Sequence, residues 1–180
     1  MLNSTFRFHA EHVVTTRRSG RITAGLFGWI HAGGAGELTD VGPGRLTGGK
    51  YVELLEDVLL PSVRAMLVPG PEQFYLVQDN SPIHTCRTVK AWFREHPEII
   101  LLPHPPASPD LNPIEDVWAA MNKNFPHNCD RSRAAVVQNA LQAWEDLRSP
   151  VGQRNILHSV TSMPRRLNSV LAAGGGYIKY

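Results

Sequence analysis

The sequence predicts an α/β fold, with a mixed sheet flanked by helices, from three observations. Two apolar runs, at residues 74–77 and 99–102, have the length and flanking turn residues of strands that are buried on both faces of a sheet. The segment between them places apolar residues at helical spacing, and this alternation of strand and helix is typical of sheets with parallel members. A glycine-rich stretch within residues 25–41 predicts a hairpin ahead of them.

The first half of the chain supplies the hairpin and one helix. Large apolar side chains at residues 25–31 indicate one strand, and residues 37–41 indicate the returning strand. The glycines at residues 32–36 allow the positive φ angles of a tight turn between them. Apolar residues then recur at helical spacing over residues 51–63, which predicts an amphipathic helix interrupted near Pro61.

The second half of the chain is predicted to be mainly helical. The proline-rich residues 103–109 indicate an extended loop. The helix after it has Asn112 as its predicted cap and Pro113 at its first position. Residues 131–173 indicate one or two further helices, which end at the glycines of residues 174–176.

Length and composition indicate one domain without a membrane segment. The 180 residues include 18 basic and 16 acidic side chains, and the net charge of +2 does not by itself indicate nucleic-acid binding. We divide the domain into a poorly defined lead-in (1–20), a core (21–125) and a helical C-terminal part (126–180). No apolar run approaches the roughly 18 residues of a membrane helix. Cys86 and Cys129 form no CxxC pair, which favours free thiols in an intracellular compartment.

Asp79 and Glu115 are the candidate catalytic and metal-binding residues. Asp79 follows the strand predicted at 74–77, and ligands gather at the carboxyl ends of strands in such sheets. Glu115 comes after 35 intervening residues, in the first turn of a helix, so the two carboxylates are expected to approach closely enough to share a hard cation such as Mg²⁺. Two such ions activate a water or a 3′-hydroxyl in phosphodiester cleavage and strand transfer. Each acid also has a structural interpretation: an Asx turn for Asp79, and a capping box with Asn112 for Glu115.

The residues around both acids resemble a known family. VQDNSPIHT at residues 77–85 and LPHPPASPDLNPIEDVW at residues 102–118 closely resemble the QDNxPxH and SPDLNPIExxW motifs of the mariner-like DDE transposase superfamily. Upstream, FGWI at 27–30 and GAGEL at 34–38 resemble the hairpin of that family, and SMPRRL at 162–167 resembles its C-terminal end. Two long motifs in the right order make the resemblance specific.

The resemblance implies an RNase H-like fold in which three acids face two metal ions. By motif correspondence, Asp79 is the second acid and Glu115 is the third. The first acid of the family lies on the first strand of the sheet, and no similar phrase precedes Gly25. We therefore expect a catalytic domain that lacks the first strand and its acid. Glu11, the only acid before Asp40, is a weak candidate for the lost ligand.

The same resemblance implies a function. The ancestral activity is metal-dependent DNA cleavage and strand transfer in DNA transposition, with Mg²⁺ or Mn²⁺ as cofactor and transposon-end DNA as partner. It further implies a nuclear location and a possible homodimer. Because the first acid is not found, we expect this chain to be inactive by itself. The alternative is a non-catalytic nucleic-acid-binding or protein-interaction module derived from a transposon.

Basic residues near both ends are candidate DNA contacts. They are Arg17, Arg18, Arg21, Arg165 and Arg166. If these side chains share one face, they are placed to hold DNA phosphates; otherwise they are solvated surface charges.

The histidines have simpler interpretations than catalysis or zinc binding. We expect His84 to brace the loop after Asp79 by hydrogen bonding rather than to act as a base. His84 with Cys86, and His127 with Cys129, do not have the spacing of zinc fingers.

Overall fold

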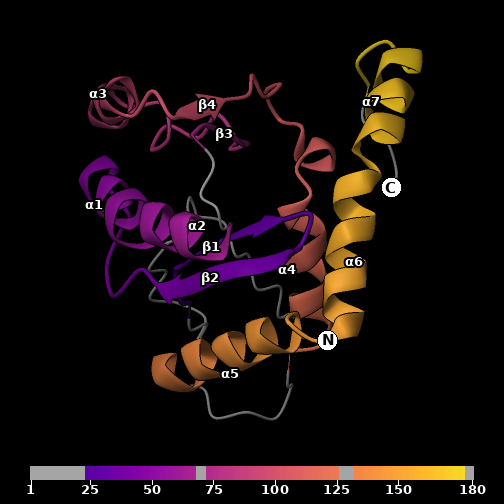
Figure 1. The fold of residues 1–180 in the computed structure, drawn as a ribbon. Helices are drawn as coiled ribbons and strands as arrows, with labels where there is room; N and C mark the ends of the chain where they lie inside the picture. Colours follow the sequence, from indigo (N-terminus) through magenta and orange to yellow (C-terminus); the bar gives the residue numbers. More distant parts are fainter. Residues whose placement is uncertain (1–22, 68–71, 126–131, 177–180) are drawn as a thin grey trace, which may run out of the picture.

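The structure is a computed structural model that describes residues 23–67, 72–125 and 132–176 (Figure 1). In chain order its elements are β1 (Leu26–His31), β2 (Gly34–Asp40), α1 (Gly48–Leu54), the π-helical turn η1 (Leu55–Leu59), α2 (Leu60–Met66), β3 (Phe74–Leu76), α3 (Arg87–Glu95), β4 (Ile99–Leu101), the 3₁₀ turn η2 (Pro109–Leu111), α4 (Ile114–Lys123), α5 (Arg133–Asp146), α6 (Pro150–Thr161) and α7 (Met163–Ala172). None of the helices in these ranges is both long and apolar enough to span a bilayer.

The hairpin predicted near the start of the core is confirmed. β1 and β2 pair antiparallel from Leu26 opposite Asp40 to His31 opposite Gly34, with an irregularity between Gly28 and Ile30. The hairpin needs glycine at position 36, because a Cβ there would lie 2.2 Å from the Trp29 ring. This close approach allows the indole to lie flat against the neighbouring strand.

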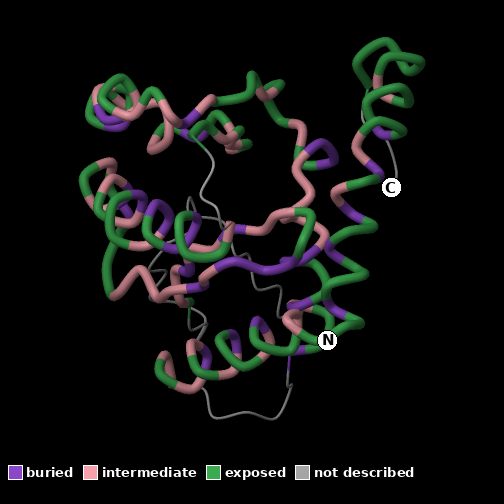
Figure 2. Tube along the Cα trace, viewed as in Figure 1, coloured by how far each residue is buried: buried purple, intermediate pink, exposed green. Residues whose placement is uncertain are grey.

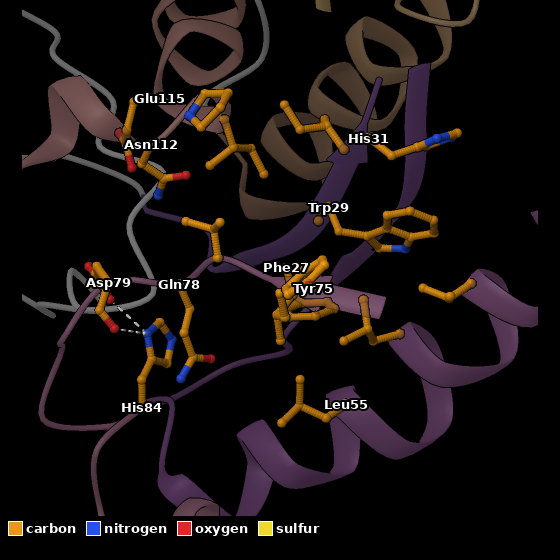
Figure 3. A pocket seen from close by; sticks show the side chains of 18 of the residues that line it. Phe27, Trp29, His31, Leu55, Tyr75, Gln78, Asp79, His84, Asn112 and Glu115 are labelled. Atoms are coloured by element: carbon orange, nitrogen blue, oxygen red, sulfur yellow. Dashed lines mark hydrogen bonds and ion pairs between the residues drawn. The ribbon is translucent and has the colours of Figure 1, made fainter. Parts of the chain in front are cut away.

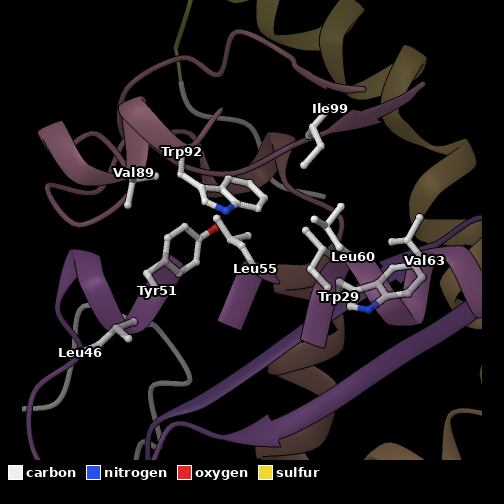
Figure 4. Close-up of a cluster of buried hydrophobic side chains, with 10 residues drawn as sticks. Trp29, Leu46, Tyr51, Leu55, Leu60, Val63, Val89, Trp92 and Ile99 are labelled. Atoms are coloured by element: carbon white, nitrogen blue, oxygen red, sulfur yellow. The ribbon is translucent and has the colours of Figure 1, made fainter. Parts of the chain in front are cut away.

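Helices cover both faces of the hairpin. On one face, helices α4, α5 and α6 pack against the hairpin and form what we call the α4–α6 core. Its buried residues are Leu26, Ala35, Leu38, Val117, Trp118, Met121, Ala140, Trp144 and Ile156. On the other face, the helices from α1 to α3 form what we call the α1–α3 core. Its buried residues are Trp29, Leu46, Tyr51, Leu55, Leu59, Leu60, Val63, Val89, Trp92 and Ile99 (Figure 4). Because successive side chains of a strand point to opposite faces, Leu26 and Ile30 join the first core, whereas Phe27 and Trp29 join the second.

The strands predicted at 74–77 and 99–102 form a second, parallel sheet. β3 and β4 are joined through α3, as the alternating pattern predicts, and Tyr75 lies opposite Ile100. The Phe74 amide donates to the Glu98 carbonyl at 2.9 Å, and the Leu102 amide donates to the Leu76 carbonyl at 3.0 Å. The predicted mixed sheet is therefore divided: within the described residues, the hydrogen-bonded pairs are β1–β2 and β3–β4.

The helix predicted at 51–63 has a different form from the expected one. It runs without a break from α1 through η1 into α2, and the π-helical turn directly precedes Leu60 and Pro61. Proline lacks an amide hydrogen, and its ring crowds the carbonyl four residues before it. Widening the preceding turn accommodates both effects, so the predicted interruption becomes a π-helical turn.

The C-terminal helices also differ in detail from the prediction. Within the described residues 132–173 there are three helices rather than one or two, because Pro150 and Pro164 each lie at the start of a new one, α6 and α7. Helix α4 begins at Ile114 with Pro113 as its N-cap and no side-chain capping hydrogen bond, so Asn112 is not the cap that we expected. Figure 2 shows long exposed stretches along α7, in contrast to the buried positions along β2.

Candidate functional site

A cavity of about 360 Å³ lies between the two sheets. Its described lining includes every residue from Leu26 to His31 along β1, and every residue from Phe74 to Asp79 along β3 and the turn after it. Asp79 and Glu115 both line it, and both lie toward the same end, with His84 and Asn112 nearby (Figure 3). The fold thus brings the two predicted site acids to one cavity from distant parts of the sequence.

Asp79 lies in a turn just after β3, and several hydrogen bonds orient it. Its Oδ1 atom accepts from the Ser81 amide at 3.1 Å, which is the Asx turn of the structural interpretation. The same oxygen lies 2.7 Å from His84 Nδ1, and this ring nitrogen is also 3.3 Å from the Asp79 carbonyl oxygen. The prediction that His84 braces this loop by hydrogen bonding is confirmed. The Asx turn and the brace hold the carboxylate at the cavity wall.

The Tyr51 ring packs against the His84 ring. The two rings lie 4.4 Å apart between centroids, and the Tyr51 hydroxyl donates to Gln78 Oε1 at 2.7 Å. Burial raises the pKa of the Tyr51 hydroxyl, and the negative charge of Asp79 adds to this rise. Tyr51 is therefore a neutral hydrogen-bond donor at physiological pH. Nothing in the sequence near Tyr51 indicates this role.

A hydrogen bond ties the two acid-bearing loops together. The Asn80 side-chain amide donates to the His104 carbonyl at 2.5 Å, and His104 Nε2 lies 3.1 Å from the Ser108 carbonyl oxygen. In the same loop Ala107 has a φ of 52°, a left-handed conformation that shapes the approach to η2. Asn80 thereby links the turn of Asp79 to the loop that leads to Glu115.

Glu115 lies in the first turn of α4, where the helix dipole favours a negative charge. Its backbone amide donates to the Asn112 carbonyl at 3.1 Å. Because Pro113 occupies the N-cap, the capping box proposed with Asn112 is not the arrangement at this helix end.

Arg166 differs from the expected surface contact. Its residue is only 5% exposed, and its guanidinium forms an ion pair with Asp116 and donates to the Asp110 carbonyl at 3.1 Å. A buried and paired guanidinium of this kind anchors α7 to α4 and η2 instead of facing DNA. Arg165, the next residue, is exposed. Arg166 is accordingly withdrawn from the set of candidate DNA contacts.

Several other predicted residues fall outside the described ranges. They are Glu11, Arg17, Arg18, Arg21, His127 and Cys129. Across residues 23–67, 72–125 and 132–176, no group of three or more histidine, cysteine or acidic side chains is arranged to hold a metal ion.

Comparison with known proteins relates the chain to transposases. The family model described as "DDE superfamily endonuclease" matches residues 10–135. The Tcb2 transposase of Caenorhabditis briggsae is 33% identical over 133 residues, which cover 72% of this chain and 45% of that protein. The Tc1 transposase of Caenorhabditis elegans is 32% identical over 133 residues, with 73% and 45% covered. The chain therefore matches a little under half the length of these relatives.

Solved structures confirm the predicted fold. The crystal structure of the catalytic domain of Mos1 mariner transposase superposes with a TM-score of 0.75 at 22% identity, and the match covers 87% of this chain and 76% of that one. The Mos1 mariner paired end complex with Mn gives a TM-score of 0.77 at 22% identity, with 92% and 48% covered. At this level of identity the likeness establishes the RNase H-like α/β fold.

Proposed function

Because the chain belongs to the DDE superfamily of endonucleases, we propose that Asp79 and Glu115 are catalytic metal ligands of a domain that acts on DNA in transposition. The observation that carries this proposal is that both carboxylates line the same end of one cavity although 35 residues separate them. The cofactor of the proposed site is Mg²⁺ or Mn²⁺, and the Mos1 catalytic domain has been solved with each of these metals.

The residues at this end of the cavity fit a hard cation. Carboxylate oxygens are the ligands that Mg²⁺ and Mn²⁺ prefer, and Asp79 and Glu115 supply them from a turn and from a helix N-terminus. The Ser81 amide and the His84 ring orient the Asp79 carboxylate before any ion arrives. Bound divalent ions supply the activation of a water or 3′-hydroxyl and the stabilisation of the leaving oxygen.

The chain by itself is proposed to bind DNA without cleaving it. Two-metal chemistry needs enough acids to hold both ions, and the ligands proposed within the described residues are two, Asp79 and Glu115. The alternative proposal is a non-catalytic nucleic-acid-binding module. The proposal includes self-association on paired DNA ends and action in the nucleus.

Binding of Mn²⁺, followed by electron paramagnetic resonance, tests the proposed ligands. We expect Asp79→Asn and Glu115→Gln each to weaken Mn²⁺ binding by about tenfold or more, because each removes one carboxylate ligand. The matched controls are Asp57→Asn and Glu53→Gln, which change exposed acids outside the cavity. Equal Mn²⁺ affinity in the site variants and the controls would refute the assignment of these ligands.

A DNA assay separates binding from cleavage. The purified chain is incubated with transposon-end DNA and either metal, and retention on a filter and strand scission are measured together. We expect weak, sequence-tolerant binding that falls steeply with salt, and no cleavage. Arg165→Ala should reduce the binding, because Arg165 is the exposed member of the C-terminal arginine pair. Cleavage that disappears in Asp79→Ala would mean that the chain holds a complete catalytic site, and Glu11 would then be the first further residue to replace.

A further inference from the structure

Tyr51 of α1 approaches the Asp79 turn through two different neighbours. Its hydroxyl donates at 2.7 Å to Oε1 of Gln78, the residue directly before Asp79. Its ring packs at 4.4 Å between centroids against the ring of His84, and His84 Nδ1 lies 2.7 Å from Asp79 Oδ1. The hydrogen bond and the ring contact therefore converge on the carboxylate that we propose as a metal ligand.

The surroundings of Tyr51 restrict the movement of its side chain. The residue is only 4% exposed, and the Phe27 ring of β1 packs against it edge-on, with the centroids 6.0 Å apart. Its amide donates to the Thr47 carbonyl at 2.9 Å, and the Thr47 side chain caps the same end of α1. A side chain packed on this many sides keeps its ring and its hydroxyl in one position.

The groups around His84 determine which ring nitrogen carries its hydrogen. Nδ1 lies 2.7 Å from the Asp79 carboxylate oxygen and 3.3 Å from the Asp79 carbonyl oxygen, and both of these oxygens are acceptors. Nδ1 must therefore be the donor. Because the Tyr51 ring packs against this imidazole, it limits the rotation that would break the hydrogen bond to Asp79.

We propose that Tyr51 is a positioning residue of the metal site, which orients Asp79 through His84 and Gln78 and so strengthens the binding of a divalent cation. This inference rests on the proposed function, in which Asp79 is a metal ligand. Replacing a side chain that orients a metal ligand typically weakens metal binding by about 10- to 100-fold. A tyrosine that only filled the α1–α3 core would contribute to stability without this effect.

Two replacements of Tyr51 separate its hydrogen bond from its ring contact. Tyr51→Phe removes only the hydroxyl, whereas Tyr51→Leu also removes the ring that packs against His84. Electron paramagnetic resonance measures the Mn²⁺ affinity of the full chain, and urea denaturation measures its stability. We expect Mn²⁺ binding to weaken by about threefold in Tyr51→Phe and by at least about tenfold in Tyr51→Leu.

A double-mutant cycle tests the route through Gln78. Gln78→Met removes the acceptor of the Tyr51 hydroxyl and keeps a side chain of similar length. If the hydroxyl acts through Gln78, this variant should bind Mn²⁺ as Tyr51→Phe does, and the double variant should be no weaker than either single one. Losses that multiply in the double variant would overturn this route. Tyr51→Phe and Gln78→Met both keep most of the side-chain volume, so the cycle remains informative if Tyr51→Leu does not fold.

A matched core variant identifies an effect that is merely structural. Leu60→Ala opens a cavity in the same α1–α3 core, and Leu60 is 3% exposed but is not among the described residues that line the site cavity. Its stability should fall, while its Mn²⁺ affinity should stay within about twofold of that of the native chain.

A signal from the His84 ring gives a second readout that needs no metal. Long-range ¹H–¹⁵N nuclear magnetic resonance of the metal-free chain should show the ring hydrogen on Nδ1. This signature should be lost in Tyr51→Leu and kept in Leu60→Ala. It reports on the contact between Tyr51 and His84 even if Asp79 binds no ion.

Three results would overturn the inference. They are a Mn²⁺ affinity in Tyr51→Leu within about twofold of the native value, an equal loss of affinity in Leu60→Ala, and a Tyr51→Leu chain that keeps the His84 hydrogen on Nδ1. Asp79→Asn is the reference variant. Unchanged Mn²⁺ affinity in Asp79→Asn would refute the proposed function itself. A loss in Asp79→Asn beside unchanged Tyr51 variants would refute only the positioning role.

Discussion

The two sheets of this protein are packed to different degrees. The β1–β2 hairpin lies between two helical layers, and Leu26, Trp29 and Leu38 are each at most 8% exposed. In the β3–β4 sheet, Ile99 is buried, but Tyr75 is 69% exposed and neighbouring apolar side chains are partly exposed. Asp79 of the proposed site follows β3 of the less enclosed sheet, whereas Glu115 lies in the first turn of α4, a helix of the α4–α6 core. Hydrogen bonds between side chains and loops hold Asp79 in position.

This contrast separates the stability of the domain from the geometry of its site. The hairpin and the helices α4–α6 share one buried hydrophobic core within the described residues. The Asp79 turn depends on contacts with His84 and Asn80, and each of these is a single hydrogen-bonding side chain. Substitutions in the hairpin core should therefore affect folding first, and those around β3 should affect local order first.

The largest expected effect is on the hairpin side, at Trp144. Its side chain is 1% exposed, stacks on Trp118 with ring centroids 5.2 Å apart, and donates from Nε1 to the Gly36 carbonyl at 2.9 Å. Trp144→Ala should lower the free energy of unfolding by about 3–5 kcal/mol, because it leaves a large cavity and removes a buried hydrogen bond to the Gly36 carbonyl. Urea denaturation measures this. Leu141→Ala on the same helix, at 38% exposed, is the control and should cost less than about 1 kcal/mol.

The next largest effect is expected at Arg166, which connects α7 to α4 and η2. Arg166→Ala leaves Asp116 without its buried partner, so the free energy of unfolding should fall by about 3 kcal/mol. Arg165→Ala, its exposed neighbour, should leave stability within about 0.5 kcal/mol. Thermal and urea denaturation of both variants measure the difference. Equal losses in the two variants would contradict the assignment of Arg166 as the anchor of α7.

The sequence predicts the strands and the hairpin, and it indicates both proposed site acids, because each of these depends on local signals. Apolar runs, glycines at turns and the two motifs can be recognised without knowledge of distant residues. The contacts that orient the acids join distant positions: Tyr51 and Gln78 are 27 apart, Asn80 and His104 are 24 apart, and Arg166 and Asp116 are 50 apart. No periodic pattern marks such pairs. The misassignment of Arg166 has this origin, since paired arginines in the sequence do not reveal which one is buried.

A smaller, pH-dependent effect is expected where the hairpin meets α5. Arg133 forms an ion pair with Asp40, and the Gly42 amide donates to the same carboxylate at 2.9 Å. Burial alone would raise the pKa of Asp40, but these hydrogen bonds and the charge of Arg133 outweigh it and lower the pKa below 3.8. The carboxylate therefore stabilises the fold fully at neutral pH. That contribution begins to fall as the pH drops below 3.8 and is lost once the pH passes below the folded-state pKa.

Asp40→Asn tests this contribution. The variant should lose about 1 kcal/mol of unfolding free energy at neutral pH, since the pair is partly exposed. The gap between native and variant chains should narrow as the pH falls below 3.8. Urea titrations at neutral and acidic pH measure the gap. A gap that widens in acid would mean that the pair does not stabilise the fold through an ionised Asp40.

The smallest effect is expected on the open face of the β3–β4 sheet. Tyr75 is 69% exposed within this chain, so Tyr75→Thr removes little buried apolar area and keeps a residue with high β-propensity. The free energy of unfolding should change by no more than about 0.5 kcal/mol. Leu38→Thr in β2 is the counterpart in the enclosed sheet. Because Leu38 is 8% exposed within the α4–α6 core, its replacement should cost about 2–3 kcal/mol. Urea denaturation of the two variants therefore compares the sheets directly. A loss at Tyr75 that approached the loss at Leu38 would mean that this face of β3 is covered in the folded protein, and the contrast between the two sheets would then fail.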